Sequence, residues 1–157
     1  MKRAGATAAL ILMLTTIGCD HMTKHIAAQQ LAGTSGRSYF NDILRFEYAE
    51  NPGAFLSLGS TLPDWARNGL LIIGAGIGLA TVAIAALKFR WRGLPFFGAS
   101  LFVAGGISNL LDRLATGSVI DFVNVGVGSL RTGIFNVADV ALLAGVGLMA
   151  FGTRRGS

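Results

Sequence analysis

The sequence predicts an all-α membrane protein with four transmembrane helices and a small extracytoplasmic β element between the first and second helices. Hydrophobic residues make up 52% of the 157 residues and charged residues only 13%, with a mean hydropathy of +0.60. Soluble domains have about 25% charged residues. The 22 glycines are typical of transmembrane helices that pack closely. We expect one integral membrane domain over residues 1–157.

Four apolar stretches approach the roughly 20 residues that cross the core of a bilayer. They are residues 4–28, 66–87, 94–111 and 134–151. Polar residues interrupt the first stretch near its end, so this end is expected in an interface or a protein cavity. Pro95 suits the first turn of the third helix.

Residues 29–65 are too polar and too rich in glycine and proline to cross a membrane. Within them, Leu44, Phe46 and Tyr48 alternate with charged residues, a period of two that predicts a short half-buried strand. The following apolar and aromatic residues, 55–65, suit a membrane interface. We therefore expect a small β element on the outer membrane surface.

The basic residues predict the orientation of the helices. Lysines and arginines at residues 2–3, 88–92 and 154–155 fall on one side, which the positive-inside rule makes cytoplasmic. Both termini are then cytoplasmic, and all eight acids fall on the opposite side. The net charge of +5 is explained by this topology, and we expect no nucleic-acid partner.

Asp121 and Asp139 are the candidate catalytic residues. Ionisable groups at a membrane edge are costly and usually serve a function. Two adjacent carboxylates share one proton, so one can act as a base while the other acts as an acid. We predict an aspartic-peptidase pair. The alternative, equally open from spacing alone, is that both acids cap helices or pair with Arg113 and Arg131.

Other polar residues have simpler interpretations. Asp112 and Arg113 suit a hydrogen-bonded helix end with an internal salt bridge, which gives Asp112 a structural role. Asp20 and Lys24 have the i,i+4 spacing of an ion pair, which either closes the end of the first helix or positions a substrate. His21 repeats this spacing with His25, but without further ligands we predict no metal site.

Five motifs together resemble those of the lipoprotein signal peptidase family (signal peptidase II), small four-span aspartic peptidases of bacteria. They follow one another in the family's order and extend over most of the chain. The motifs are DHMTK at residues 20–24, NPGA at 51–54, GGISNLLDR at 105–113, VIDF at 119–122 and FNVAD at 135–139. Unlike many members, this chain has Ser108 where glycine is common, and Pro52, Phe55 and Asn124 also depart from the family pattern.

The resemblance implies a catalytic pair formed by Asp121 and Asp139, with Asp20 and Lys24 holding the site or assisting substrate binding. The other residues that it implies as site-shaping are Asn51, Gly53, Asn109, Arg113 and Asn136. The implied activity is removal of signal peptides from diacylglyceryl-modified prolipoproteins by cleavage before the lipidated cysteine. No cofactor is implied. We expect a monomer in the bacterial cytoplasmic (inner) membrane, in contact with lipid and with its active site near the extracytoplasmic face.

Three other functions were considered. A proton-coupled transporter would have acids along a path across the membrane, whereas here all acids lie on one side. A lipoprotein precursor is suggested by the sequence before Cys19, but three further apolar stretches follow. A catalytically inactive relative that binds lipopeptides would not need both acids.

Overall fold

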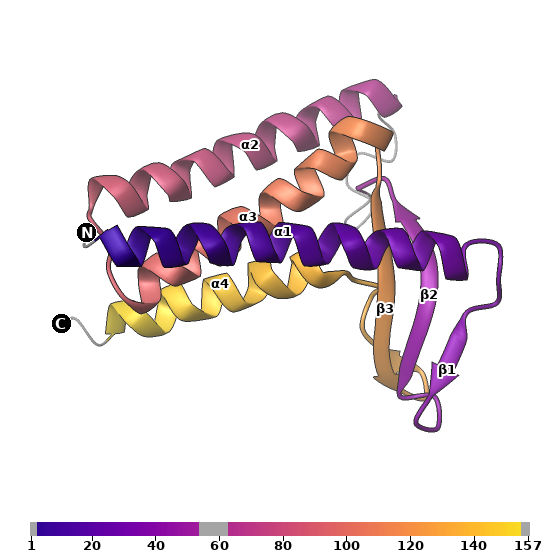
Figure 1. Ribbon diagram of the computed structural model, residues 1–157. Coiled ribbons are helices and arrows are strands. Elements are labelled where there is room, and N and C mark those ends of the chain that lie inside the picture. Colours follow the sequence, from indigo (N-terminus) through magenta and orange to yellow (C-terminus); the bar gives the residue numbers. More distant parts are fainter. Residues whose placement is uncertain (1–2, 54–62, 155–157) are drawn as a thin grey trace.

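The computed structural model describes residues 3–53 and 63–154 and shows a helical bundle with a small sheet across one end (Figure 1). The helices are α1 (Arg3–Leu31), α2 (Asp64–Lys88), α3 (Leu94–Thr116) and α4 (Val137–Arg154). The strands are β1 (Arg37–Tyr39), β2 (Leu44–Asn51), β3 (Val119–Val127) and β4 (Leu130–Arg131). This arrangement confirms the expected fold class.

Three of the described helices are long and apolar enough to cross a membrane. Their qualifying segments are Ala4–Leu31, Trp65–Lys88 and Leu94–Thr116, and a shorter apolar segment covers Val137–Gly152. Helix α4 begins at Val137, three residues later than the expected span, because the backbone of Phe135 pairs with that of Val123 in β3. That α4 crosses the bilayer remains a prediction.

Helix α3 lies at the centre of the bundle and contacts each of the other three helices. Its backbone comes very near that of α4 where two glycines face each other. A Cβ atom on Gly98 would lie 2.7 Å from the carbonyl oxygen of Gly145, and one on Gly145 would lie 2.6 Å from that of Gly98. Side chains at either position would therefore push the two helices apart, as expected for close packing in a membrane.

The sheet is antiparallel with strand order β1-β2-β3-β4. The strand expected around Phe46 is present as β2, but β3 and β4, which lie between α3 and α4, were not predicted. Pairing of β2 with β3 aligns Asn51 with Val119 and Ala49 with Asp121. The last residues of β2 therefore lie beside the acid of β3.

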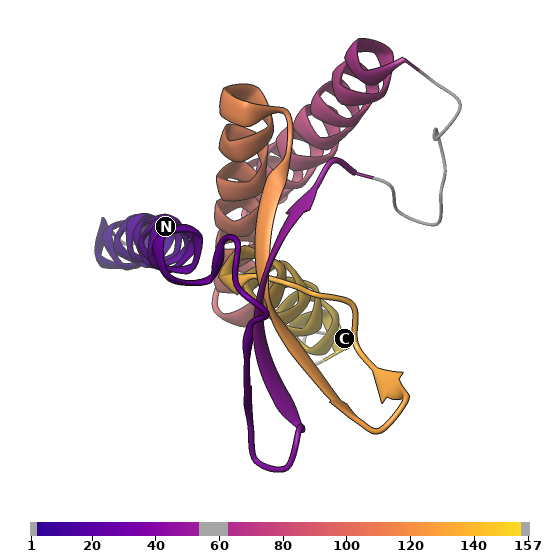
Figure 2. The same ribbon diagram turned by 90° about the vertical axis from the view of Figure 1, so that its right-hand side faces the viewer.

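The sheet is attached to the C-terminal end of α1 by a small apolar cluster. Ala27 and Leu31 of α1 are buried against Phe122 of β3. From there the two hairpins reach sideways past the helices (Figure 2). Most of the expected interfacial segment 55–65 lies outside the described residues. Within its described part, Trp65 is 79% exposed.

Candidate active site

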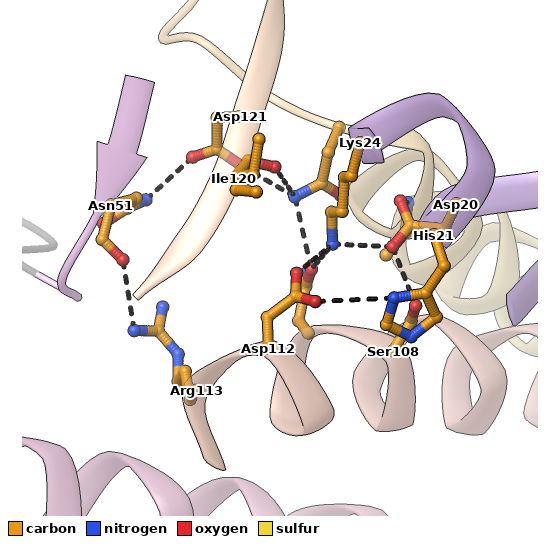
Figure 3. A network of polar contacts seen from close by, with 12 residues as sticks. Asp20, His21, Lys24, Asn51, Ser108, Asp112, Arg113, Ile120 and Asp121 are labelled. Atoms are coloured by element: carbon orange, nitrogen blue, oxygen red, sulfur yellow. Dashed lines mark hydrogen bonds and ion pairs between the residues drawn. The ribbon is translucent and has the colours of Figure 1, made fainter. Parts of the chain in front are cut away.

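Asp121 lies in β3, close to the end of the bundle that carries the sheet, and is only 3% exposed. Its two oxygens accept hydrogen bonds from the side-chain amides of Asn51, at 3.0 Å, and Asn136, at 2.7 Å. Figure 3 shows Asn51 pointing at this carboxylate from the end of β2. Burial is the main cause that raises the pKa of Asp121, and the charge of Asp139 adds to it, while the two amide bonds act in the opposite direction.

Asp139 lies in the first turn of α4, where it forms a reciprocal cap with Asn136. The Asn136 side-chain oxygen accepts from the Asp139 backbone N–H at 2.9 Å, and Asp139 Oδ2 accepts from the Asn136 backbone N–H at 3.1 Å. This is the pattern of a capping box, which satisfies two N–H groups at a helix start. The other oxygen, Oδ1, accepts from Asn109 of α3 at 2.9 Å.

Asn136 therefore contacts both candidate catalytic acids. Its side-chain nitrogen donates to Asp121, and its backbone nitrogen donates to Asp139. The residue is 1% exposed, so these bonds are shielded from water. The chain segment between β3 and α4 brings the two acids to one asparagine, although they are 18 positions apart in the sequence.

Lys24 of α1 contacts two further acids, Asp20 and Asp112, and also Asn109, which donates to Asp139. Its ammonium donates to Asp20 at 2.6 Å, to Asp112 at 2.6 Å and to the Asn109 side-chain oxygen at 2.8 Å. An ammonium has three donors, so all three are used. The i,i+4 ion pair expected between Asp20 and Lys24 is confirmed, and its side chains are 0% and 3% exposed.

The prediction of a salt bridge between Asp112 and Arg113 is wrong. Asp112 pairs with Lys24 and lies 3.6 Å from the His21 ring (Figure 3). Consecutive residues on a helix point in different directions, so a partner on another helix is better placed than the next residue. Arg113 instead donates to the backbone oxygen of Asn51 at 3.3 Å.

The alternative prediction for Asp121 and Asp139 was that both cap helices or pair with arginines, and it holds only in part. Asp139 does cap a helix, but Asp121 lies inside a strand. Arg131 was the other possible partner, and its guanidinium instead contacts Asp42 and the side chain of Asn124. These contacts connect the two hairpins at the far end of the sheet.

Gly53 follows β2 and turns the chain back towards Arg113. Its backbone N–H donates to the Asn51 side chain at 2.9 Å, and its φ of +90° lies in a region that residues with a side chain rarely adopt. A Cβ atom would lie 2.1 Å from Leu71 and 3.0 Å from the Arg113 guanidinium. Glycine at this position therefore lets the turn approach the site.

The structure brings every candidate site residue into one connected set of contacts, and it adds two residues that were not predicted to belong to the site. Ser108 donates to Asp20 at 2.7 Å, and His21 lies beside Asp112. A signal for Ser108 was present, because a serine inside an apolar helix needs a hydrogen-bond partner. Its partner depends on how α3 packs against α1.

The two candidate catalytic acids share a chemical environment suited to proton transfer. Among the described residues, each hydrogen bond to Asp121 or Asp139 comes from an amide. An amide orients a carboxylate without adding a positive charge. Two such acids, one with a raised pKa, can hold a single proton between them, which is the state that acid–base catalysis by a carboxyl pair requires.

Comparison with known proteins gives consistent matches. A family model described as signal peptidase (SPase) II matches residues 12–154. A lipoprotein signal peptidase of Methylocella silvestris is 38% identical over 107 residues, which span 66% of this chain and 60% of that protein. One of Streptococcus pneumoniae is 30% identical over 151 residues, 93% of this chain and 90% of that protein. A solved structure of a bacterial membrane enzyme has the same fold, with a TM-score of 0.82 and 24% identity over 94% of this chain and 92% of that chain.

The family match includes all five motifs and the residues that form the contacts described above. Together with the apolar helices, it identifies a membrane enzyme. The chain belongs to the signal peptidase II family of aspartic peptidases.

Proposed function

We propose that this chain removes signal peptides from prolipoproteins, with Asp121 and Asp139 as the catalytic pair. The main supporting observation is that both carboxylates are hydrogen-bonded to Asn136. A second is that burial raises the pKa of Asp121. Because one acid of such a pair keeps a proton while the other is ionised, the pair can supply a base and an acid at the same time.

In the proposed reaction the ionised carboxylate takes a proton from a water molecule as the water oxygen attacks the peptide carbonyl. The protonated carboxyl donates its proton to the carbonyl oxygen, which gives a neutral tetrahedral intermediate. The intermediate collapses when the C–N bond breaks, and the leaving nitrogen receives a proton from the pair. The products are a carboxyl terminus on the signal peptide and a free amine on the lipoprotein.

The surrounding residues have supporting roles in this proposal. Asn51, Asn109 and Asn136 orient the two carboxylates through their side-chain amides. Gly53 and Arg113 shape the adjacent turn, and Asp20, Lys24 and Asp112 hold the ends of the helices together. The residues in this last group contact Asp121 or Asp139 only through other residues.

The proposed substrate is a prolipoprotein already modified with diacylglyceryl, cut before the lipidated cysteine. An apolar cavity of about 220 Å³ between α2, α3 and α4 supports this proposal, because Asn109 and Arg113 line it together with seven apolar residues. The other lining residues are Ala75, Gly78, Leu79, Phe102, Gly106, Leu110 and Leu142. A lipid-bearing peptide could thus reach the acids from the side of the bundle.

The proposed location is the bacterial cytoplasmic (inner) membrane, where the chain acts as a monomer surrounded by lipid. Both termini lie in the cytoplasm, because the basic residues concentrate at that end of the helices. The sheet and the catalytic pair then lie at the extracytoplasmic face. This is the side on which a lipoprotein signal peptide ends.

A gel-shift cleavage assay with purified protein in detergent tests the function. The substrates are a diacylglyceryl-modified prolipoprotein and its unmodified precursor, and the enzymes are the wild type and Asp139→Asn. We expect cleavage of the modified substrate by the wild type alone. Folded wild-type protein that cuts neither substrate would instead support the inactive, lipopeptide-binding relative.

A further inference from the structure

The start of α4 is capped twice, once locally and once from another helix. The N–H groups in the first turn of a helix have no partner within the helix. Asn136 accepts from the N–H of Asp139, as described above. The N–H of Ala138 donates instead to Asp20 of α1 at 2.8 Å, across 118 positions of sequence. We call the second contact the remote cap.

The remote cap depends on a carboxylate that has no access to water. Asp20 is 0% exposed, and a buried carboxylate is very unfavourable unless its charge and its lone pairs are satisfied. Besides Ala138, its donors are Lys24, at 2.6 Å, and Ser108 of α3, at 2.7 Å. Three helices, α1, α3 and α4, therefore meet at one side chain.

Ser108 does not make the contact that a helical serine usually makes. Serines in helices often donate to the carbonyl oxygen four residues earlier in the same helix. Ser100, two turns earlier on α3, does this with Phe96 at 2.8 Å. Ser108 donates across to α1 instead and is 0% exposed. Its hydroxyl thus connects two helices rather than completing its own.

Two neighbouring residues of α3 act on two neighbouring residues of α4. Asn109 donates directly to Asp139 at 2.9 Å, and Ser108 reaches Ala138 through Asp20. The first contact orients the Asp139 carboxylate, and the second fixes the backbone that bears it. Misplacing a reacting group by about 1 Å can reduce the rate about 100-fold.

We propose that Ser108 and Asp20 are positioning residues that hold Asp139 in register with Asp121 through the remote cap. This inference rests on the function proposed above. Ser108 itself touches neither acid of the pair. Its effect on catalysis is transmitted by Asp20 and the first turn of α4.

The test compares Ser108→Ala with Ser100→Ala in the full-length chain, purified in detergent and assayed on the modified prolipoprotein. Both changes remove one hydroxyl from a largely buried site on the same helix. We expect Ser108→Ala to lower kcat about 10-fold with KM nearly unchanged, because the pair is misaligned while substrate binding is intact. Ser100→Ala should leave both constants within about twofold of the wild type. Equal kinetics for the two variants would overturn the proposal.

A double-mutant cycle with Asp20→Asn tests the route. If Ser108 acts through Asp20, then Ser108→Ala should have little further effect on kcat when Asp20→Asn is already present. If the two changes instead lower kcat by factors that multiply, the inference is overturned, because Ser108 would then act by another route. If the Asp20 variant does not fold, the comparison of the two serine variants still decides the question.

Hydrogen exchange separates this inference from the proposed function. Loss of the remote cap should speed exchange of the Ala138 amide about 10-fold in Ser108→Ala and leave it unchanged in Ser100→Ala. This measurement does not require cleavage. An inactive wild type would contradict the proposed function, whereas an Ala138 amide that exchanges equally in both variants would contradict the remote cap.

Discussion

Two pairs of acids lie a few side chains apart at the end of the bundle that carries the sheet, and they have different kinds of partners. Asp20 and Asp112 both contact the ammonium of Lys24, each at 2.6 Å. The hydrogen bonds to Asp121 and Asp139 in the described part of the chain come from amides. The residue type is the same in both pairs, but the charge of the partner differs.

This difference separates structural acids from acids that can exchange a proton. A lysine that contacts two carboxylates offsets their negative charge. Neutral amides orient a carboxylate without offsetting its charge, so a second acid nearby can keep one of the two protonated. Asn109 lies at the boundary, because its oxygen accepts from Lys24 and its nitrogen donates to Asp139.

The largest effect should follow from removing one acid of the amide-bound pair. Asp121→Asn and Asp139→Asn should each lower kcat about 10³-fold or more, because either change removes a group that transfers protons. Cleavage of the modified prolipoprotein is the measurement, and a normal elution profile in detergent is the control for folding. Substantial activity in either variant would show that the acids do not work as a pair.

The same Asp121→Asn variant should be more stable than the wild type at neutral pH. Since the pKa of Asp121 is raised in the folded protein, its favourable contribution is complete at low pH and is lost as the pH rises through the folded pKa. Asparagine does not ionise and has no such loss. Thermal unfolding between about pH 3 and pH 7, a range that begins below the ordinary aspartate pKa of about 3.9, should show the difference growing with pH.

The second-largest effect should come from the lysine-bound pair. Lys24→Met should lower the free energy of unfolding by about 3–5 kcal/mol, because it removes the ammonium from the buried Asp20 and the partly buried Asp112. Lys88→Met, at the opposite end of the bundle, is the control and should change it by less than about 0.5 kcal/mol. Thermal unfolding in detergent measures both. Equal stability of the two variants would remove the distinction between the two pairs of acids.

The sequence was sufficient for those parts of the molecule that depend on local spacing. Helix positions follow from the lengths of apolar segments, and the Asp20–Lys24 pair follows from the i,i+4 rule. The acids of the proposed pair were recognised because carboxylates are rare at the edge of a membrane helix. The helix positions and the ion pair each concern residues within one element, and each acid was recognised from its own place in the sequence.

Contacts between distant elements could not be predicted in the same way. Strand β3 has an acid in its middle and residues buried on both faces, so it lacks the simple alternation that revealed β2. The partner of Asp112 lies on α1, 88 positions away, and depends on how α1 and α3 are rotated against each other. The role of Ser108 depends on the same packing.

A smaller effect should result from changing one asparagine whose side-chain amide donates to the proposed catalytic pair. Asn51→Ala removes a hydrogen bond that lowers the pKa of Asp121, so this pKa should rise further. The pair would hold its proton to higher pH, and the pH profile of kcat should move upward, with a loss of about 10-fold at the original optimum. Steady-state cleavage across pH measures the shift. A profile that moves to lower pH would contradict the inference that the Asn51 hydrogen bond stabilises the charged form of Asp121.

The smallest effect should come from His21, the second partner of Asp112. The His21 ring lies 3.6 Å from Asp112 and its side chain is 41% exposed, whereas that of Lys24 is 3% exposed. Water and salt weaken an exposed pair, so His21→Gln should change the free energy of unfolding by at most about 1 kcal/mol. Thermal unfolding of His21→Gln and of Lys24→Met compares the two partners of Asp112. A loss as large as that of Lys24→Met would mean that the exposed His21 ring stabilises Asp112 as much as the buried ammonium does.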